Sequence, residues 1–87
     1  MARGAVLIGC GFMPSQEDVR TAVSQGYVEN AENLTTYSGD EAMTQEQATM
    51  RYVAAQVSKG WDIPMGGLTA NKVTFASGRN MWVVCPA

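Results

Sequence analysis

Carboxylate side chains are the main candidates for acid–base chemistry in this 87-residue chain, because it contains eight aspartate and glutamate residues and no histidine. Two adjacent pairs, Glu17–Asp18 and Asp40–Glu41, are direct neighbours in sequence. A catalytic acid and base must converge on one pocket, but neighbouring residues of a helix point in different directions. Both pairs also lie near expected helix starts, where acids interact favourably with the helix dipole. We therefore expect structural acids, no catalytic residue and a protein that is not an enzyme.

Metal binding and cofactor binding have equally few candidate residues. Cys10 and Cys85 lie near opposite ends of the chain, neither belongs to a CxxC pair, and no histidine could complete a zinc site. The segment Gly9–Gly11 resembles the start of a GxGxxG dinucleotide fingerprint, but Pro14 stands where the third glycine belongs. We expect no cofactor, no metal site and two free, buried thiols. The two thiols could nevertheless lie close together if the first and last strands are neighbours.

The acidic residues are concentrated in the middle of the chain. Residues 17–46 contain seven of the eight acids and one base, a net charge of −6, whereas four bases and one acid follow from residue 47 onward. One interpretation is a solvated surface, since surface charges cost little. The other is an acidic face that docks on a basic surface of a partner protein. The residues of this candidate face are Glu29, Glu32, Asp40 and Glu41. Nucleic acid is not an expected partner, because the bases are scattered.

Two apolar segments are further candidates for contact with a partner. Residues 61–68 are rich in turn formers but carry large apolar side chains, so they either cover the core or form an exposed loop anchored by Trp61 and Met65. The last expected strand, residues 81–85, is apolar on both faces. A loop, a partner or a second copy of the chain should cover its outer face. Trp82 and Val84 are therefore the candidate residues for self-association, and a homodimer is one form that it could take.

The expected elements in the first half of the chain are a strand, a helix and a second strand. Residues 5–13 form an apolar, glycine-interrupted segment typical of a buried strand. Ser15 and Asp18 form a capping box for a helix that should end at Gly26. A polar loop then leads to a short strand over residues 34–37, which are β-branched or aromatic.

A second helix and a hairpin are expected in the other half. The helix begins at a capping box, either Ser38 with Glu41 or Thr44 with Gln47, and runs to about Ser58. Its expected core-facing stripe consists of Met50, Val53, Ala54, Val57 and Trp61. Residues 72–76 and 81–85 should form a hairpin around residues 77–80.

These elements predict one small, complete α+β domain over residues 1–87. Its order is β-α-β-α-β-β, with a mostly antiparallel sheet of three or four strands and both helices packed on one face. No apolar run is long enough to span a membrane, and we expect a cytoplasmic protein.

The expected function follows from what the chain lacks. In size and composition it is similar to small inhibitors that phages and mobile elements direct against host proteins, such as anti-CRISPR proteins, although it carries no motif of such a family. We therefore expect a non-enzymatic module that blocks a surface of a larger host protein or complex. The alternative is a structural protein that self-associates through its C-terminal strand.

Overall fold

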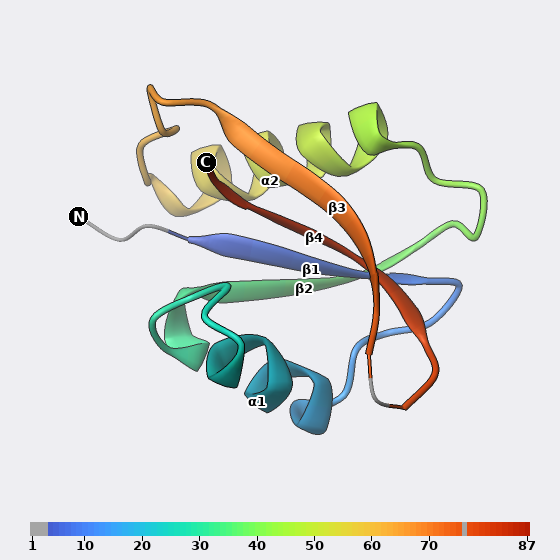
Figure 1. Ribbon diagram of the computed structural model, residues 1–87. Helices are drawn as coiled ribbons and strands as arrows, with labels where there is room; N and C mark the ends of the chain where they lie inside the picture. Colours follow the sequence, from blue (N-terminus) through green and yellow to red (C-terminus); the bar gives the residue numbers. More distant parts are fainter. Residues whose placement is uncertain (1–3, 76) are drawn as a thin grey trace.

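The computed structural model describes residues 4–75 and 77–87 of the chain. Its elements follow the order β-α-β-α-β-β, as the sequence predicts, and Figure 1 shows the strands between the two helices. The bounds are β1 Ala5–Cys10, α1 Gln16–Ser24, a turn of 3₁₀ helix Ala31–Asn33, β2 Leu34–Gly39, α2 Gln45–Lys59, β3 Leu68–Thr74 and β4 Asn80–Pro86.

The four strands form one mixed sheet in the order β2-β1-β4-β3. β1 pairs in parallel with β2 and antiparallel with β4, while β3 and β4 form the antiparallel hairpin expected from the sequence. The predicted α+β class and the mostly antiparallel sheet are therefore confirmed. The strands β1 and β4 are central, and β2 and β3 are the two edges.

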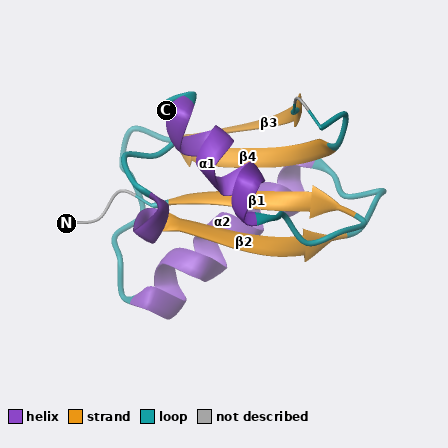
Figure 2. Cartoon of the chain, turned by 90° about the horizontal axis from the view of Figure 1, so that it is seen from below, coloured by secondary structure: helices purple, strands orange, loops and turns teal. Residues whose placement is uncertain are grey.

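The two helices lie on opposite faces of the sheet, which corrects the expectation that both pack on one face (Figure 2). The physical reason is that the central strands are apolar on both sides. In β1, Leu7 joins the cluster that includes Ala22 of α1, whereas Val6 and Ile8 join the cluster that includes Tyr52 of α2. The second face of the sheet is thus covered from within the chain.

The helix starts agree with the capping boxes in the sequence. The Ser15 N–H donates to the Asp18 carboxylate at 2.9 Å, and the Asp18 N–H donates to the Ser15 hydroxyl at 3.3 Å. Thr44 and Gln47 make the equivalent pair of bonds at the start of α2. The alternative start at Ser38 is excluded, because β2 continues through that residue. Asp18 therefore has the structural role expected of it.

The buried face of α2 differs from the predicted stripe. The side chains that α2 buries are those of Ala48, Tyr52, Ala55 and Gln56. Met50 and Val57 lie on the opposite side of the helix and are 71% and 66% exposed. The predicted stripe has the correct period but the wrong phase, because small residues let the helix approach the sheet closely.

The two cysteines are free thiols, as expected, and both are half-buried. The first and last strands are indeed neighbours, but they are antiparallel. Val84 pairs with Val6 and Met81 pairs with Gly9, so Cys85 and Cys10 lie toward opposite ends of the sheet. The strand pairing therefore keeps the two thiols apart.

Candidate functional site

The four residues of the predicted acidic face are all exposed, but the structure places them in two groups. Glu29 and Glu32 precede β2, and Asp40 and Glu41 follow it. A six-residue strand such as β2 is roughly 17–20 Å long. The acids therefore mark the two ends of one edge strand and do not gather into a single cluster.

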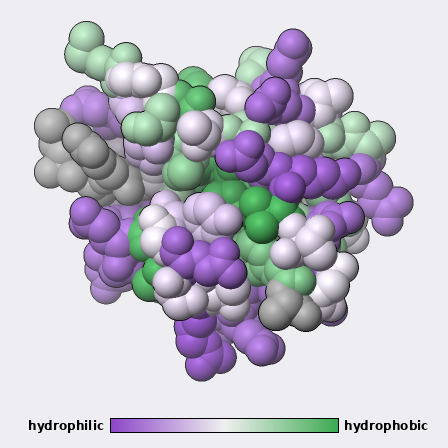
Figure 3. Space-filling model, in the orientation of Figure 1, coloured by the Kyte–Doolittle hydropathy of each residue, from purple (hydrophilic) through white to green (hydrophobic). Residues whose placement is uncertain are grey.

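The two candidate anchors of the loop after α2 have different surroundings. Trp61 is half-buried, its ring lies close to Gly4, and the Lys59 ammonium stands 4.8 Å from the ring centroid. Met65 is 103% exposed. Its loop leads into β3 and protrudes with a pale green surface at the upper left of Figure 3. Trp61 thus lies over the buried Gly4 just before β1, and Met65 is the fully exposed residue of the two candidate anchors.

The candidate residues for self-association lie in the middle of the sheet, which corrects the idea that the last strand pairs with a second copy. β4 is hydrogen-bonded to β1 on one side and β3 on the other, so it has no free backbone edge. Val84 is fully buried and Trp82 is half-buried against the cluster beneath α2. Their role is therefore in the core.

The outward face of α2 is the feature that the sequence analysis missed. Met50, Val53, Ala54 and Val57 lie together on the side of the helix opposite Tyr52. We call these four residues the outer stripe. Met50, Ala54 and Val57 are exposed, and Val53 is half-buried. One signal in the sequence could have revealed that the outer stripe is exposed. Ala48, Tyr52 and Ala55 are spaced i, i+4 and i+7 and form a second apolar face on the same helix.

Two open hollows lie on either side of Met50. The first, of about 390 Å³, lies between the end of β2 and α2. Its lining residues are Ser38, Gly39, Asp40, Met43, Gln47, Met50 and Arg51. The second, of about 400 Å³, lies between α2 and β3. Its lining residues are Gln45, Glu46, Thr49, Met50, Leu68 and Ala70. Met50 is therefore an apolar ridge between two depressions that partner side chains could enter.

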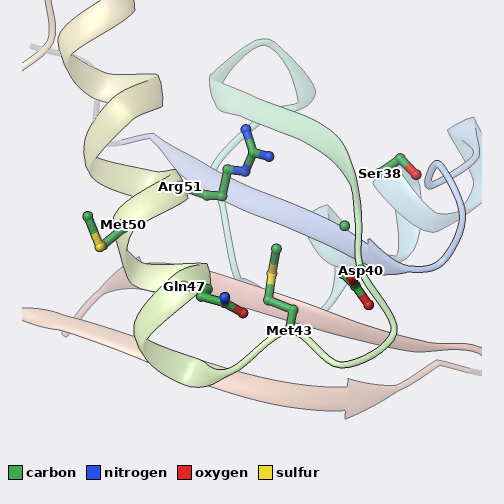
Figure 4. A pocket seen from close by; sticks show the side chains of 7 residues that line it. Ser38, Asp40, Met43, Gln47, Met50 and Arg51 are labelled. Carbon is green, nitrogen blue, oxygen red and sulfur yellow. The ribbon is translucent and has the colours of Figure 1, made fainter.

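The first hollow has an apolar floor and charged walls (Figure 4). The Met43 side chain points into the space between α2 and the end of β2, and Met50 points away on the other side of the helix. The Arg51 guanidinium lies 5.5 Å from the centroid of the Tyr37 ring, which orients this cation along β2. The Asp40 carboxylate is held by the Ala42 N–H at 2.9 Å. These groups can recognise an apolar or charged side chain.

The described residues contain no group of three or more histidine, cysteine, aspartate or glutamate side chains placed to hold a metal ion. Over the same part of the chain, neither helix has both the length and the hydropathy to cross a bilayer.

Comparison with known proteins identifies no relative for this chain. No protein-family model matches it, and neither a curated protein nor a solved structure is found to be similar.

Proposed function

We propose that this chain is a non-enzymatic protein-binding module that acts by covering a surface of a larger protein or complex. In this proposal it works as an inhibitor of the kind that phages and mobile elements direct against host proteins. The observation that carries the proposal is the outer stripe of α2, where Met50 and Val57 are mostly exposed on a helix that already packs its other face. Contiguous exposed apolar side chains mark sites of protein contact.

The outer stripe contributes little to folding. Met50 and Val57 keep most of their surface in water, so they gain little of the transfer free energy that buried apolar side chains gain. A binding role accounts for their chemistry, because methionine adapts its shape to a partner surface and the two flanking hollows can receive side chains. Met65 and Ile63 add exposed apolar surface on the loop that follows the helix.

We further propose that the module acts in the cytoplasm. Cys10 and Cys85 are free thiols, the state that a reducing compartment maintains.

The test uses the whole chain immobilised as bait for proteins of its native host. The double variant Met50→Gln, Val57→Gln removes the apolar stripe while keeping the helix, and Ser58→Ala is the control on an exposed position of the same helix that lines neither hollow. We expect one host protein or complex to be retained by the wild type and the control and lost by the double variant. The activity of the retained host protein or complex should fall when one equivalent of the wild-type chain is added. Identical retention by all three baits would contradict the proposal.

A further inference from the structure

The strand β2 has a free backbone edge along one side of the sheet. The Gly39 carbonyl accepts a hydrogen bond from the Gly11 N–H at 2.8 Å, which places the backbone groups of Gly39 on the side of β1. The direction of these groups alternates along a strand, so those of Thr36 and Ser38 point away from β1. In the described part of the chain, the backbone of neither residue is bonded to a turn, loop or side chain.

The opposite edge of the sheet is protected in ways that β2 is not. β3 carries an exposed lysine, Lys72, and its Ala70 carbonyl already accepts a hydrogen bond from the Gln45 side chain at 2.8 Å. Charged residues and covering groups of this kind prevent an edge strand from pairing with another chain. β2 has the sequence LTTYSG, with no charge and no proline between its ends. Of the two edge strands in the described part of the chain, β2 is therefore the one with an open edge of β-branched and aromatic character.

Charge at the two ends of β2 indicates what can pair with it. Glu29 and Glu32 lie before the strand, and Asp40 and Glu41 lie after it, all exposed. If two copies of the chain paired through β2, acids would face acids at both ends, whether the strands ran parallel or antiparallel. A strand flanked by lysine or arginine at both ends would instead find an opposite charge at each end.

We propose that the β2 edge binds an extended segment of a partner protein, about six residues long with basic residues at both ends, as an added strand of the sheet. The backbone groups of Thr36 and Ser38 supply the hydrogen bonds, and the acids at the two ends select the basic flanks. The site goes beyond the outer stripe of α2, although the two adjoin, since the hollow lined by Ser38 and Asp40 also contains Met50.

The probe is a synthetic peptide of alternating threonine and valine, six residues long, with two lysines at each end. Its control carries glutamates in place of the lysines. Binding of the lysine peptide should slow amide hydrogen exchange at Thr36 and Ser38 and leave Tyr37 unchanged, because the Tyr37 N–H already faces β1. A peptide without effect on β2, an equal effect of the glutamate peptide, or changes confined to α2 would each overturn the proposal.

Matched charge variants test the selection of the basic flanks. Glu32→Lys with Glu41→Lys should weaken binding of the lysine peptide about tenfold at low salt. Glu17→Lys with Glu46→Lys alters two exposed acids and the net charge by the same amount, but in the first turns of α1 and α2 and not in the segments that flank β2, and should change binding less than about twofold. Equal weakening by both pairs would overturn the specific role of the β2 ends.

Further variants separate this site from the outer stripe and from self-pairing. Thr36→Pro removes an N–H on the free edge only and should abolish peptide binding, whereas Thr36→Ala should retain it. The Met50→Gln, Val57→Gln variant should bind the peptide as the wild type does, so this proposal and the proposed function can fail separately. Protection of Thr36 that appears without peptide and grows with protein concentration would show that a second copy occupies the edge, which would overturn the proposal.

Discussion

Replacing Tyr52 with phenylalanine removes one oxygen atom from a buried polar contact between α2 and the residue before β1. Tyr52 is the largest of the fully buried side chains, and it lies in α2 against the sheet. Its hydroxyl donates a buried hydrogen bond to the Gly4 carbonyl at 2.8 Å, across 48 residues of sequence. The substitution keeps the aromatic ring in place, so the change in stability reports on this hydrogen bond and on little else.

The expected loss follows from the state of the remaining partner. Without the Tyr52 hydroxyl, the Gly4 carbonyl stays buried with no side-chain donor among the described residues, and an unsatisfied buried group costs about 1–3 kcal/mol. We therefore expect Tyr52→Phe to lower the free energy of unfolding by about 2 kcal/mol at pH 7. For a domain of this size, that loss corresponds to a fall in Tm of roughly 8–16 °C.

The same side chain gives the stability a pH dependence in alkali. Burial raises the pKa of the Tyr52 hydroxyl above its ordinary value of about 10, with a smaller contribution from the charge of Cys85. The unfolded chain then loses the phenolic proton at a lower pH than the folded chain. The stabilising effect is complete below pH 10 and is lost as the pH rises through the raised pKa, by up to about 1.4 kcal/mol per pH unit. The phenylalanine variant lacks this slope, so the stability difference between the two proteins should narrow above pH 10.

Urea unfolding, followed by the fluorescence of Trp61 and Trp82, measures both effects at pH 7 and at steps above pH 10. Tyr37→Phe is the control, because that ring is half-buried and its hydroxyl makes no hydrogen bond in the described residues. Its effect at pH 7 should stay within about 0.5 kcal/mol. Equal stability of wild type and Tyr52→Phe at pH 7 would refute the Gly4 hydrogen bond. If the stability difference between wild type and Tyr52→Phe stayed constant above pH 10, the argument that burial raises the pKa of Tyr52 would be refuted.

Two further predictions concern core packing and the end of α2. Trp82→Ala should cost about 3–5 kcal/mol in urea unfolding, but Trp82→Phe much less, because the buried indole Nε1 has no partner among the described residues. An equal loss of unfolding free energy in Trp82→Ala and Trp82→Phe would show that the indole N–H has a hydrogen-bond partner. Gly60→Ala should cost about 1 kcal/mol, since Gly60 ends α2 with a φ of +70°, whereas Gly66→Ala should be neutral, because Gly66 has no positive φ. Equal thermal midpoints would contradict the left-handed cap, because both sites have open space around the added methyl group.

The local elements of the fold could be predicted because their signals act over a few residues. The bonds of the capping boxes at Ser15 and Thr44 join residues three apart, and Gly60 ends its helix through its own backbone conformation. Such interactions depend little on the rest of the chain. The hairpin of β3 and β4 is equally local and its pairing was predicted, but β3 begins at Leu68 and ends at Thr74, whereas residues 72–76 were expected.

The sequence could not predict which residues of α2 face the sheet, or which face of the sheet each helix covers. Both depend on contacts between distant segments. Met50 and Val57 are more hydrophobic than the alanines of α2, but the sheet surface beneath the helix is already filled by large side chains such as Ile8 and Trp82. Small residues fit closely against that surface, and Tyr52 is accommodated because its hydroxyl reaches the carbonyl of Gly4. The candidate site was missed for the same reason, since the outer stripe is exposed only when the other face is packed.

A single partner could contact both the outer stripe and the β2 edge, and a stable complex needs more contact area than the outer stripe alone provides. A standard protein interface covers about 800 Å² on each partner and some 20–30 residues. That area is about 15% of the 5205 Å² surface of this chain. The four residues of the outer stripe cannot supply so many contacts, so a partner held stably must reach beyond them. The hollow beside Met50 leads directly to Ser38 and Asp40 at the end of β2, where a free backbone edge and oriented charges begin. A partner that covers the stripe and also adds a strand to the sheet would combine apolar area with directional hydrogen bonds.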